Sequence, residues 1–368
     1  MLGSDRTTQL RDAMASQAFA AAVIVPGANM RYLAGLDIHL SERLSVAFFP
    51  TDGQAAVVLP ALEQPRAAAQ ARLPLHFYPW DDSEGPDPAL RRCVGDLGLA
   101  GKRVGVEYTA MRLLELRGIE EAAPGVQVAD ITPILSGLRM VKDAAELAAM
   151  RTAARIVETA LHAAIAQIRV GMTERELADL WDQAIRAAGS APSFSPSVAS
   201  GPNSANPHHS NSDRAFQPGD LIIMDGGAIY DGYASDITRT LTLGEPGPQA
   251  RRIYELVLAA NAAGRAAVRP GTTGAMIDQA ARAVITAGGY GPQFLHRTGH
   301  GLGLEIHEPP YIVAGSQAPL AVGTTFTVEP GVYVAGLGGV RIEDDLAVAD
   351  DGAESLTTFA RDLIIIDA

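Results

Sequence analysis

The chain has 368 residues, of which 47% are hydrophobic and 19% are charged, and its formal net charge is −13. This length predicts about two domains of roughly 150 residues each, and the apolar content excludes a chain that is disordered throughout. The acidic balance argues against a nucleic-acid partner, because such a partner requires a basic face. A single cysteine, Cys93, excludes an intrachain disulfide and a cysteine-based zinc site.

The sequence contains no segment that resembles a membrane anchor or an export signal. No window approaches the run of about 20 apolar residues that a membrane span requires. The first ten residues lack the basic-then-apolar pattern of a signal peptide. We therefore expect a cytoplasmic protein without a membrane partner.

Residues 20 to about 135 alternate short strands with short helices. Six β-branched or aromatic segments, each closed by Pro, Gly or Asp, predict strands at 20–26, 44–50, 55–60, 75–78, 104–107 and 126–131. Helices are predicted between them at 62–71, 89–99 and 110–122. The pattern is that of an α/β domain over residues 1–137. Nothing in it has the spacing of a metal site or a nucleophile, so we interpret it mainly as a scaffold.

Two pairs of helices are predicted in the second half, about 100 residues apart. Apolar residues recur every three or four positions over 147–168, which indicates one face of a long helix. Thr173 and Glu176 form a capping box that opens a second helix, and Gly189 ends it. The arrangement returns with predicted helices at 251–268 and 274–287.

The two halves of this region also repeat a strand that ends in a carboxylate. Residues 219–227 match residues 323–331 at an offset of 104, which places Asp225 and Glu329 six residues after the first glycine of each copy. A second carboxylate follows in each copy, Asp236 eleven residues on and Glu343 fourteen residues on. A duplicated half-domain would close around a central cleft where the four carboxylates meet. Coincidence between two ordinary βαβ-like stretches is the alternative.

Five of the eight histidines fall in the same region of the chain, namely His208, His209, His296, His300 and His307. Aspartate, glutamate and histidine with little sulfur suit divalent metals such as Mn²⁺, Co²⁺ or Zn²⁺. Four carboxylates and one imidazole carry more negative charge than one ion needs, so we expect two ions, which carboxylates can bridge at about 3.5–4 Å. Such a pair lowers the pKa of a bridging water and produces hydroxide near neutral pH.

Local patterns indicate that these carboxylates face one another. The Asp-Gly pair at residues 231–232 predicts a hairpin that brings Asp225 and Asp236 onto neighbouring strands. Arg341 and Glu343 lie two residues apart on a predicted strand and hence on one face, so Arg341 can orient a metal-binding carboxylate. Burying four carboxylates without a cation would be very costly, and the alternative of a solvated acidic face is disfavoured by the apolar run before Asp225.

Several segments of the second half resemble the pita-bread metallopeptidases, and among these the Xaa-Pro peptidases, namely prolidases and aminopeptidase P. The first is Thr-Gly-His-Gly-Leu-Gly-Leu-Glu-Ile-His-Glu-Pro at 298–309, and the others are residues 200–208, 235–240, 327–331 and 340–344. The resemblance covers residues 138–368 closely, whereas residues 1–137 resemble the creatinase-type N-terminal domain more loosely. It implies an α/β N-terminal domain followed by an α+β pita-bread catalytic domain with an internal pseudo-two-fold repeat.

The resemblance also implies a set of site residues. The five metal ligands would be Asp225, Asp236, His300, Glu329 and Glu343, with Asp236 and Glu343 bridging two ions per chain. Manganese is the expected metal, with cobalt or zinc as alternatives. His307 would hydrogen-bond the scissile carbonyl and stabilise the tetrahedral intermediate, and Glu329 would also handle the proton of the attacking water. His208 and His296 would line the proline and carbonyl side of the pocket.

Simpler roles are expected for several other residues. His39, His76 and His162 are predicted to be ordinary surface or packed residues, and His209 is more often structural than catalytic. The glycines around His300 are not a phosphate loop, because no Gly-Lys-Ser/Thr follows them. Cys93 is expected to pack in a helix, and the absence of Gly-x-Ser-x-Gly excludes a serine-hydrolase elbow.

The expected substrate is a small peptide with proline in the second position. The ring of proline removes the amide N–H, so general peptidases handle the Xaa-Pro bond poorly. A dipeptidase additionally needs a cation for the proline carboxylate. Many prolidases have an arginine shortly after the His-Glu-x-Pro motif, but here Tyr311 follows Pro310, and we include Tyr311 among the substrate-binding candidates. Arg43, in a predicted loop of the N-terminal half, is the candidate replacement, and a solvated surface arginine is the alternative.

We expect an Xaa-Pro dipeptidase in preference to an aminopeptidase P acting on longer peptides. A metal-free relative, such as creatinase, and a non-catalytic binding module are both disfavoured, because all five ligands and His307 are present. A hydrolase of non-peptide amides stays open. A homodimer is expected because two-fold dimers are the commonest oligomers.

Overall fold

The computed structural model describes residues 2–368, with side chains from residue 6 onward. The chain divides into two units between Arg139 and Met140, inside helix α6 (Thr132–Met140). The domain boundary predicted after residue 137 lies two residues before this division. Within the part of the chain that the structure describes, no helix combines the length and the apolar character needed to cross a lipid bilayer.

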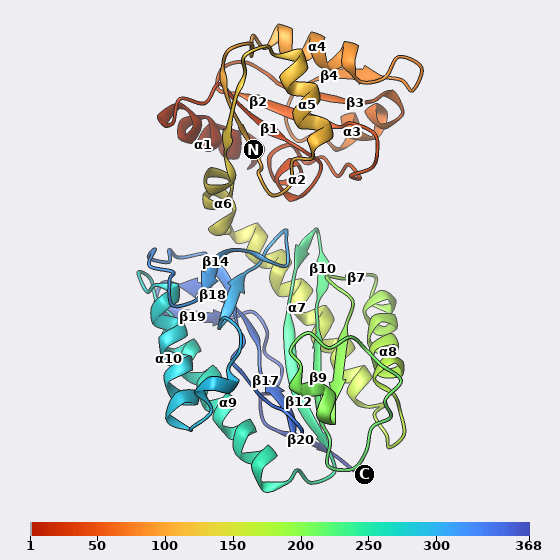
Figure 1. The fold of residues 1–368 in the computed structure, drawn as a ribbon, viewed down its shortest axis with the longest axis vertical. Helices are drawn as coiled ribbons and strands as arrows, with labels where there is room; N and C mark the ends of the chain where they lie inside the picture. Colours follow the sequence, from red (N-terminus) through yellow and green to blue (C-terminus); the bar gives the residue numbers. More distant parts are fainter. Residues whose placement is uncertain (1) are drawn as a thin grey trace. The chain divides into compact units, whose positions relative to one another are not determined.

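The N-terminal unit contains one six-stranded sheet, with the strand order β4-β3-β2-β1-β5-β6 (Figure 1). Its strands are β1 (Ala21–Ile24), β2 (Val46–Pro50), β3 (Ala55–Pro60), β4 (Leu75–Trp80), β5 (Arg103–Val106) and β6 (Gln127–Asp130). The sheet is mixed, because β1 pairs antiparallel with β2 and parallel with β5. All six strands lie where the β-branched and aromatic segments predicted them.

The helices of this unit are α1 (Leu2–Ser16), α2 (Ala28–Ala34), α3 (Gln64–Gln70), α4 (Asp87–Asp96), α5 (Leu113–Ala122) and α6. Helices α3, α4 and α5 correspond to the predicted ones, and Cys93 on α4 packs in the core with Leu90 and Ile119 as expected. Helices α1, α2 and α6 were not predicted. Two of them are short: α2 has seven residues and ends at Gly35, whose φ is 77°, and α6 has nine residues.

The C-terminal unit repeats a pair of helices, as the periodicity predicted. The pairs are α7 (Ala144–Ile165) with α8 (Glu174–Ala187), and α9 (Pro248–Ala266) with α10 (Gly274–Ala287). The predicted capping box is present. The Thr173 side chain accepts a hydrogen bond from the backbone N–H of Glu176, and the Glu176 carboxylate accepts one from the backbone N–H of Thr173. At the equivalent place before α10, Thr273 accepts from the backbone N–H of Met276.

Two larger sheets of this unit contain the strands that lead to the predicted metal ligands. One has the order β20-β12-β9-β8, with β8 (Ser197–Ser200), β9 (Leu221–Gly226), β12 (Ile237–Leu243) and β20 (Ile364–Ile366). The other has the order β14-β13-β15-β18-β19, with β13 (Gly299–Gly301), β14 (Glu308–Ile312), β15 (Thr325–Val328), β18 (Asp344–Ala349) and β19 (Gly352–Ser355). Short strands complete the unit: β7 (Ala191–Pro192), β10 (Ala228–Tyr230), β11 (Tyr233–Ala234), β16 (Gly331–Val334) and β17 (Gly338–Arg341).

Each helix pair has its own apolar core. Trp181 on α8 packs with Met224 on β9 and Leu241 on β12 in a fully buried cluster. On the other side of the repeat, Ile277 on α10 packs with Phe326 on β15. The two cores place the ends of β9 and β15, and the carboxylates that follow their apolar residues, in the interior of the unit.

Candidate metal centre

Two candidate ligands of the first repeat lie on neighbouring strands, as the hairpin predicted. Asp225 lies near the end of β9, and Asp236 directly precedes β12, which pairs antiparallel with β9 so that Asp225 is opposite Thr238. The chain turns between β10 and β11, where Asp231 and Gly232 have φ values of 46° and 81°. These left-handed values explain why an Asp-Gly pair stands there.

The second repeat contributes the other three candidates. His300 is the middle residue of β13, and Glu329 directly follows β15, the neighbouring strand. The backbone N–H of Glu329 donates to the carbonyl of Thr298 at 2.8 Å, which holds this carboxylate close to β13. Glu343 lies between β17 and β18, so the single strand predicted through Arg341 and Glu343 is wrong: β17 ends at Arg341.

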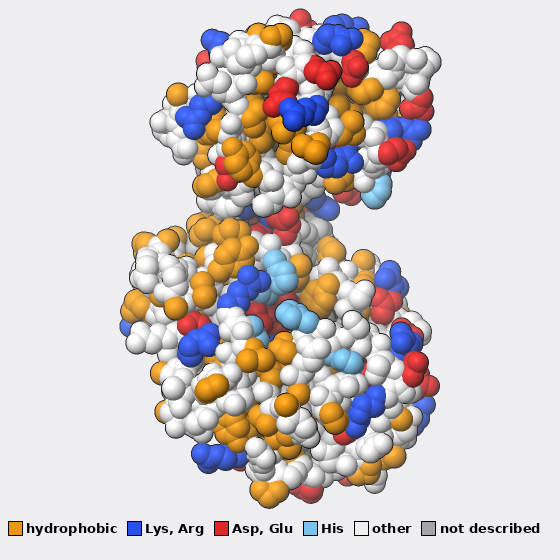
Figure 2. All heavy atoms as spheres, viewed as in Figure 1, with side chains coloured by type: hydrophobic (Ala, Val, Ile, Leu, Met, Phe, Trp, Pro, Cys, Tyr) orange, Lys and Arg blue, Asp and Glu red, His pale blue; other side chains and the backbone are white. Residues whose placement is uncertain are grey.

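All five candidates line one cavity of about 540 Å³, together with His208, His296 and His307. One donor atom each from Asp236, His300 and Glu343 lies within 4.8 Å of the other two. The Nε2 atom of His300 is 3.7 Å from Oδ2 of Asp236 and 3.4 Å from Oε1 of Glu329. Figure 2 shows histidine side chains around a hollow in the C-terminal unit, with carboxylates deeper in it.

The charges in this cavity fit a bound cation. Burial raises the pKa of Asp236 well above its usual value, and the neighbouring Glu343 and Asp225 carboxylates raise it further. Burial, and next the Glu329 and Asp225 carboxylates, raise the pKa of Glu343 well above its usual value, and burial raises the pKa of Glu329 to about 7. One buried oxygen each of Asp225 and Asp236 has no hydrogen-bond partner among the described residues. Divalent cations would supply both the missing charge and the missing contact.

The His300 ring has the tautomer and the neutral charge that a metal ligand requires. Its Nδ1 atom lies 3.2 Å from the carbonyl oxygen of Gly301, which can only accept a hydrogen bond, so Nδ1 carries the proton. The lone pair of Nε2 then faces the carboxylates. Burial, and next the adjacent His307, lower the pKa of His300 to about 3, so the ring is uncharged at neutral pH.

Arg341 orients two of the carboxylates, in agreement with its predicted position beside them. Its guanidinium donates to Oδ2 of Asp225 at 2.7 Å and to the hydroxyl of Thr238 at 3.1 Å. Thr238 in turn donates to Oε2 of Glu343 at 2.5 Å. Arg341 also donates to the hydroxyl of Tyr333 at 2.9 Å. The arginine therefore offsets part of the negative charge without occupying the space among the carboxylates.

The cavity histidines other than His300 differ in how they are held. Both ring nitrogens of His296 have partners, the carbonyl of Arg297 at 2.7 Å and the hydroxyl of Tyr333 at 2.8 Å. Burial lowers the pKa of His296 to about 4. The His307 ring stands edge-on to His300, with centroids 4.1 Å apart, and burial and then Arg297 lower the pKa of His307. Their individual catalytic roles, and that of His208, stay predictions.

Two acidic residues around the site were not singled out from the sequence. Asp345 accepts a hydrogen bond from the backbone N–H of Asp236 at 2.9 Å, which fixes the start of β12. Asp344 pairs with Arg239 at 2.9 Å and with Arg361 at 2.7 Å. Both follow the predicted ligand Glu343 directly in the run Glu-Asp-Asp at 343–345, and this run of acidic residues could have pointed to them. A sequence pattern cannot tell which carboxylates face the cavity, because the chain leaves the strand at Glu343.

Glu174 on α8 supports the segment that carries His208. Its two oxygens accept hydrogen bonds from groups on four residues, namely Ser200, Asn203, His209 and Ser212. His209 therefore contacts a structural carboxylate and does not line the cavity, as expected for its simpler role. His39, His76 and His162 are exposed.

Replacing Glu174 with glutamine is expected to lower the free energy of unfolding by about 2–4 kcal/mol, because an amide leaves some of these donors without an acceptor. Burial alone would raise the pKa of Glu174, but the hydrogen bonds outweigh it and hold the pKa below its usual value. This stabilisation is therefore complete above the unfolded-state pKa of about 4.3 and is lost as the pH falls through the folded-state value.

Chemical denaturation of wild type and Glu174→Gln at about pH 7 and about pH 3.5 measures both effects, since the difference between them should shrink at the lower pH. Glu176→Gln is the matched control, because Glu176 lies in the same helical turn, is exposed, and keeps an acceptor as glutamine. Equal losses in the two variants at neutral pH would contradict the prediction.

The two substrate-binding candidates, Arg43 and Tyr311, have different surroundings. Arg43 lies in the N-terminal unit, where its guanidinium donates to both oxygens of Asp82 at 3.0 and 2.8 Å. Tyr311 lies on β14, is 41% exposed, and carries the guanidinium of Arg297 over its ring at 4.7 Å. A role of either residue in substrate binding stays a prediction.

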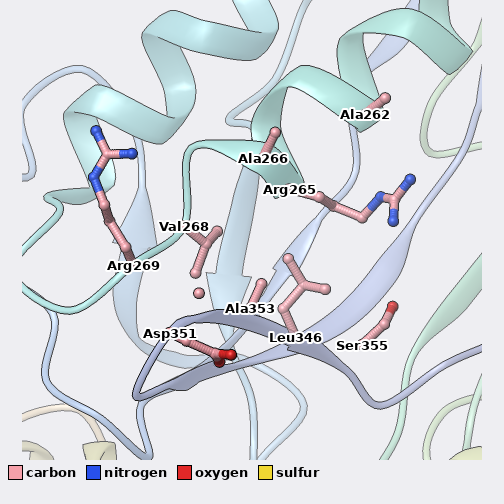
Figure 3. A pocket seen from close by; sticks show the side chains of 10 residues that line it. Ala262, Arg265, Ala266, Val268, Arg269, Leu346, Asp351, Ala353 and Ser355 are labelled. Atoms are coloured by element: carbon pink, nitrogen blue, oxygen red, sulfur yellow. The ribbon is translucent and has the colours of Figure 1, made fainter.

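A second cavity in this unit, of about 520 Å³, has a different chemistry (Figure 3). It lies at the end of α9, where Arg265 and Arg269 stand on opposite sides of it and Asp351 is the one carboxylate among its lining residues. No histidine lines it. Metal-binding groups therefore gather in the first cavity and not in this one.

Family models match both units of the chain. Residues 148–350 match the metallopeptidase family M24, and residues 6–141 match the creatinase/prolidase N-terminal domain. The chain belongs to metallopeptidase family M24. The protein is therefore a metal-dependent peptidase with a creatinase-type N-terminal domain and a pita-bread catalytic domain, as the sequence motifs led us to expect.

Individual relatives extend over nearly the whole M24 chain. A probable dipeptidase PepE from Mycobacterium tuberculosis is 38% identical over 358 residues, which cover 96% of this chain and 94% of the relative. An Xaa-Pro dipeptidase from Pyrococcus furiosus is 34% identical over 339 residues, 91% of this chain and 92% of the relative. The crystal structure of a prolidase from Thermococcus sibiricus superimposes with a TM-score of 0.94 at 35% identity, over the full length of both chains.

Proposed function

We propose that this M24 peptidase hydrolyses the Xaa-Pro bond of dipeptides in the cytoplasm, with two divalent metal ions per chain and manganese as the preferred metal. The observation that carries the proposal is the convergence of four carboxylates and His300 on one cavity of about 540 Å³. The relatives from P. furiosus and T. sibiricus, which are named as an Xaa-Pro dipeptidase and a prolidase, support the choice of bond. The relative from M. tuberculosis is named for dipeptides.

Asp225, Asp236, His300, Glu329 and Glu343 would hold the two ions, with Asp236 and Glu343 shared between them. When bound, the ions supply a water of lowered pKa that can act as a nucleophile near neutral pH. Arg341 would keep Asp225 and, through Thr238, Glu343 in place, because it donates to Asp225 and to Thr238, and Thr238 donates to Glu343.

The remaining chemistry is the movement of a proton and the stabilisation of charge. Glu329 would accept the proton of the attacking water and return it to the proline nitrogen as the carbon–nitrogen bond breaks. His307 would donate an N–H to the substrate carbonyl oxygen, where negative charge develops. His208 and His296 would line the proline and carbonyl side, and the apolar Phe194 and Ile306 line the same cavity.

Dipeptides are favoured over longer peptides, and aminopeptidase P activity is the alternative. Selectivity for dipeptides requires a cation for the proline carboxylate. Arg43 remains our prediction for a cation from the N-terminal unit, although Asp82 already offsets its charge. A homodimer is proposed on the commonness of two-fold assemblies.

The test compares hydrolysis of Leu-Pro and Leu-Pro-Gly by the Mn²⁺-loaded protein, with a chelator-treated control. We expect at least about a tenfold higher kcat/KM for Leu-Pro, the size of effect that one charged contact provides, and no turnover after chelation. Preference for Leu-Pro-Gly would make the protein an aminopeptidase P. Metal-loaded protein that is inert toward both peptides would refute the proposed bond and direct attention to non-peptide amides.

A further inference from the structure

The candidate metal cavity is lined by two arginines, and they are not equivalent. Arg341 is 6% exposed, and its guanidinium hydrogen-bonds Asp225, Tyr333 and Thr238. Arg297 is partly buried and makes no ion pair with a carboxylate of the described residues, and its charge acts on Glu329 only at a longer distance. Among the described residues, therefore, Arg297 is the one arginine lining this cavity whose charge is not already paired.

A flat aromatic ring supports Arg297 instead of an anion. The central carbon of its guanidinium lies 4.7 Å from the centroid of the Tyr311 ring. The backbone brings the two residues together, because His300 on β13 pairs with Tyr311 on β14 and the N–H of Thr298 donates to the carbonyl of Ile312 at 3.0 Å. Stacking on a ring holds the guanidinium plane but leaves its edge N–H groups available, which is the arrangement that binds a carboxylate through two hydrogen bonds.

The cavity therefore contains groups of both charges. Asp225, Asp236, Glu329 and Glu343 supply the negative charge, and Arg297 is the positive group that makes no ion pair. A free dipeptide carries both complementary charges, with an ammonium at one end, a carboxylate at the other, and the scissile bond between them. The charge of Arg297 contributes to the pKa shifts of His300, His307 and Glu329, so a group that it binds lies near the candidate metal ligands.

We propose that Arg297, seated on Tyr311, binds the C-terminal carboxylate of a dipeptide substrate and so restricts the enzyme to dipeptides. This inference rests on the proposed Xaa-Pro hydrolysis. It assigns the selecting cation to the catalytic unit itself, whereas the prediction for Arg43 assigns it to the N-terminal unit. Arg43 donates to both oxygens of Asp82 and would have to exchange that partner for the substrate.

The test uses Leu-Pro and Leu-prolinamide, which share the scissile bond and differ in the terminal charge. Arg297→Met keeps an apolar side chain on Tyr311 but removes the cation. In the Mn²⁺-loaded full-length protein we expect kcat/KM for Leu-Pro to fall roughly 10- to 100-fold further than that for Leu-prolinamide, the factor for a lost charge-assisted hydrogen bond. Any effect of Arg297 on the pKa of His307 is common to both substrates and cancels in this comparison. Arg297→Lys should recover only part of the loss, because an ammonium does not form the planar double contact.

Arg269→Met is the matched control, because Arg269 is exposed, lines the second cavity, and its loss changes the net charge equally. Inhibition by free proline and by prolinamide gives a readout of binding: wild type should be inhibited more strongly by proline, and Arg297→Met should lose this difference. Thermal unfolding and metal content show whether the variant keeps its fold and its ions.

A fall of equal size on both substrates, or no fall on Leu-Pro, would overturn the assignment of Arg297. If Arg43→Ala lost the preference for Leu-Pro over Leu-prolinamide and Arg297→Met kept it, the assignment of Arg297 would also be overturned. Arg43 of the N-terminal unit would then be the cation that binds the carboxylate. Wild-type protein that hydrolyses neither compound would refute the proposed function, and this inference with it. Wild-type protein that hydrolyses Leu-Pro, with an Arg297→Met variant that keeps the preference, would refute this inference alone.

Discussion

Replacing Asp236 with asparagine is expected to reduce kcat/KM for Leu-Pro by roughly 10³-fold or more, since bound metal ions contribute several kcal/mol to the stabilisation of the transition state. Asp236 is 4% exposed and has one buried oxygen without a partner among the described residues. Its other oxygen lies 3.7 Å from Nε2 of His300. An amide offers one oxygen and no charge, so we expect metal content to fall together with activity.

In the protein stripped of metal, the same substitution should increase the stability of the fold. Burial and the carboxylates of Glu343 and Asp225 raise the folded-state pKa of Asp236 above its unfolded value. A raised carboxyl pKa means that the folded state holds the proton more tightly, so its contribution to stability decreases as the pH rises from the unfolded value towards the folded one. Asparagine removes this penalty. Metal-free Asp236→Asn should therefore unfold at a higher temperature than metal-free wild type at neutral pH.

Elemental analysis, steady-state kinetics and thermal unfolding with and without Mn²⁺ measure these outcomes. Asp231→Asn is the matched control, because Asp231 is exposed and lies in the turn between β10 and β11, away from the cavity-lining residues. Unchanged metal content with activity near that of wild type would exclude Asp236 as a ligand.

Replacing His307 with alanine is expected to lower kcat about 10²- to 10³-fold while leaving metal content unchanged, the range seen when one donor to a developing oxyanion is removed. Burial and Arg297 lower the pKa of His307, so above about pH 6.5 the ring is neutral and has one N–H to donate. Because this donor acts on the transition state, KM should change much less than kcat.

Kinetics on Leu-Pro with parallel metal analysis tests the role of His307. His39→Ala serves as the control for the loss of an exposed histidine. If His307→Ala lost its metal ions in proportion to its activity, the ring would belong to the metal-binding set and not to the stabilisation of the substrate carbonyl.

The N-terminal unit indicates which local structures a sequence can predict. Its six strands were predicted because each is a short run of β-branched or aromatic residues closed by a turn residue. Two of the helices that were missed, α2 and α6, have only seven and nine residues, so an apolar pattern has little length in which to repeat. In the longer α1, Leu10 and Met14 are the fully buried large side chains among those described, which is too few to show a period.

The ligand set could be predicted because repetition and chemistry agreed in the sequence. Asp225 and Glu329 end matching strands 104 residues apart, and His300 lies within a glycine-rich motif. Tyr333, Thr238 and Asp345 could not be found in this way. Each acts through hydrogen bonds that only the fold brings together, such as the bond from the backbone N–H of Asp236 to Asp345 and the bond from Thr238 to Glu343.

The sequence by itself determined the family, the two-part organisation and the residues able to bind metal, because these depend on residue type, spacing and local periodicity. The tertiary structure decided how the charges are distributed among them. No local sequence pattern distinguishes Arg43 from Arg297. In the structure, Arg43 is paired with Asp82, whereas Arg297 lies on Tyr311 in the cavity without an ion pair. Whether a charge is paired depends on which strands and loops meet, and strand pairing brings together segments whose separation no local pattern encodes.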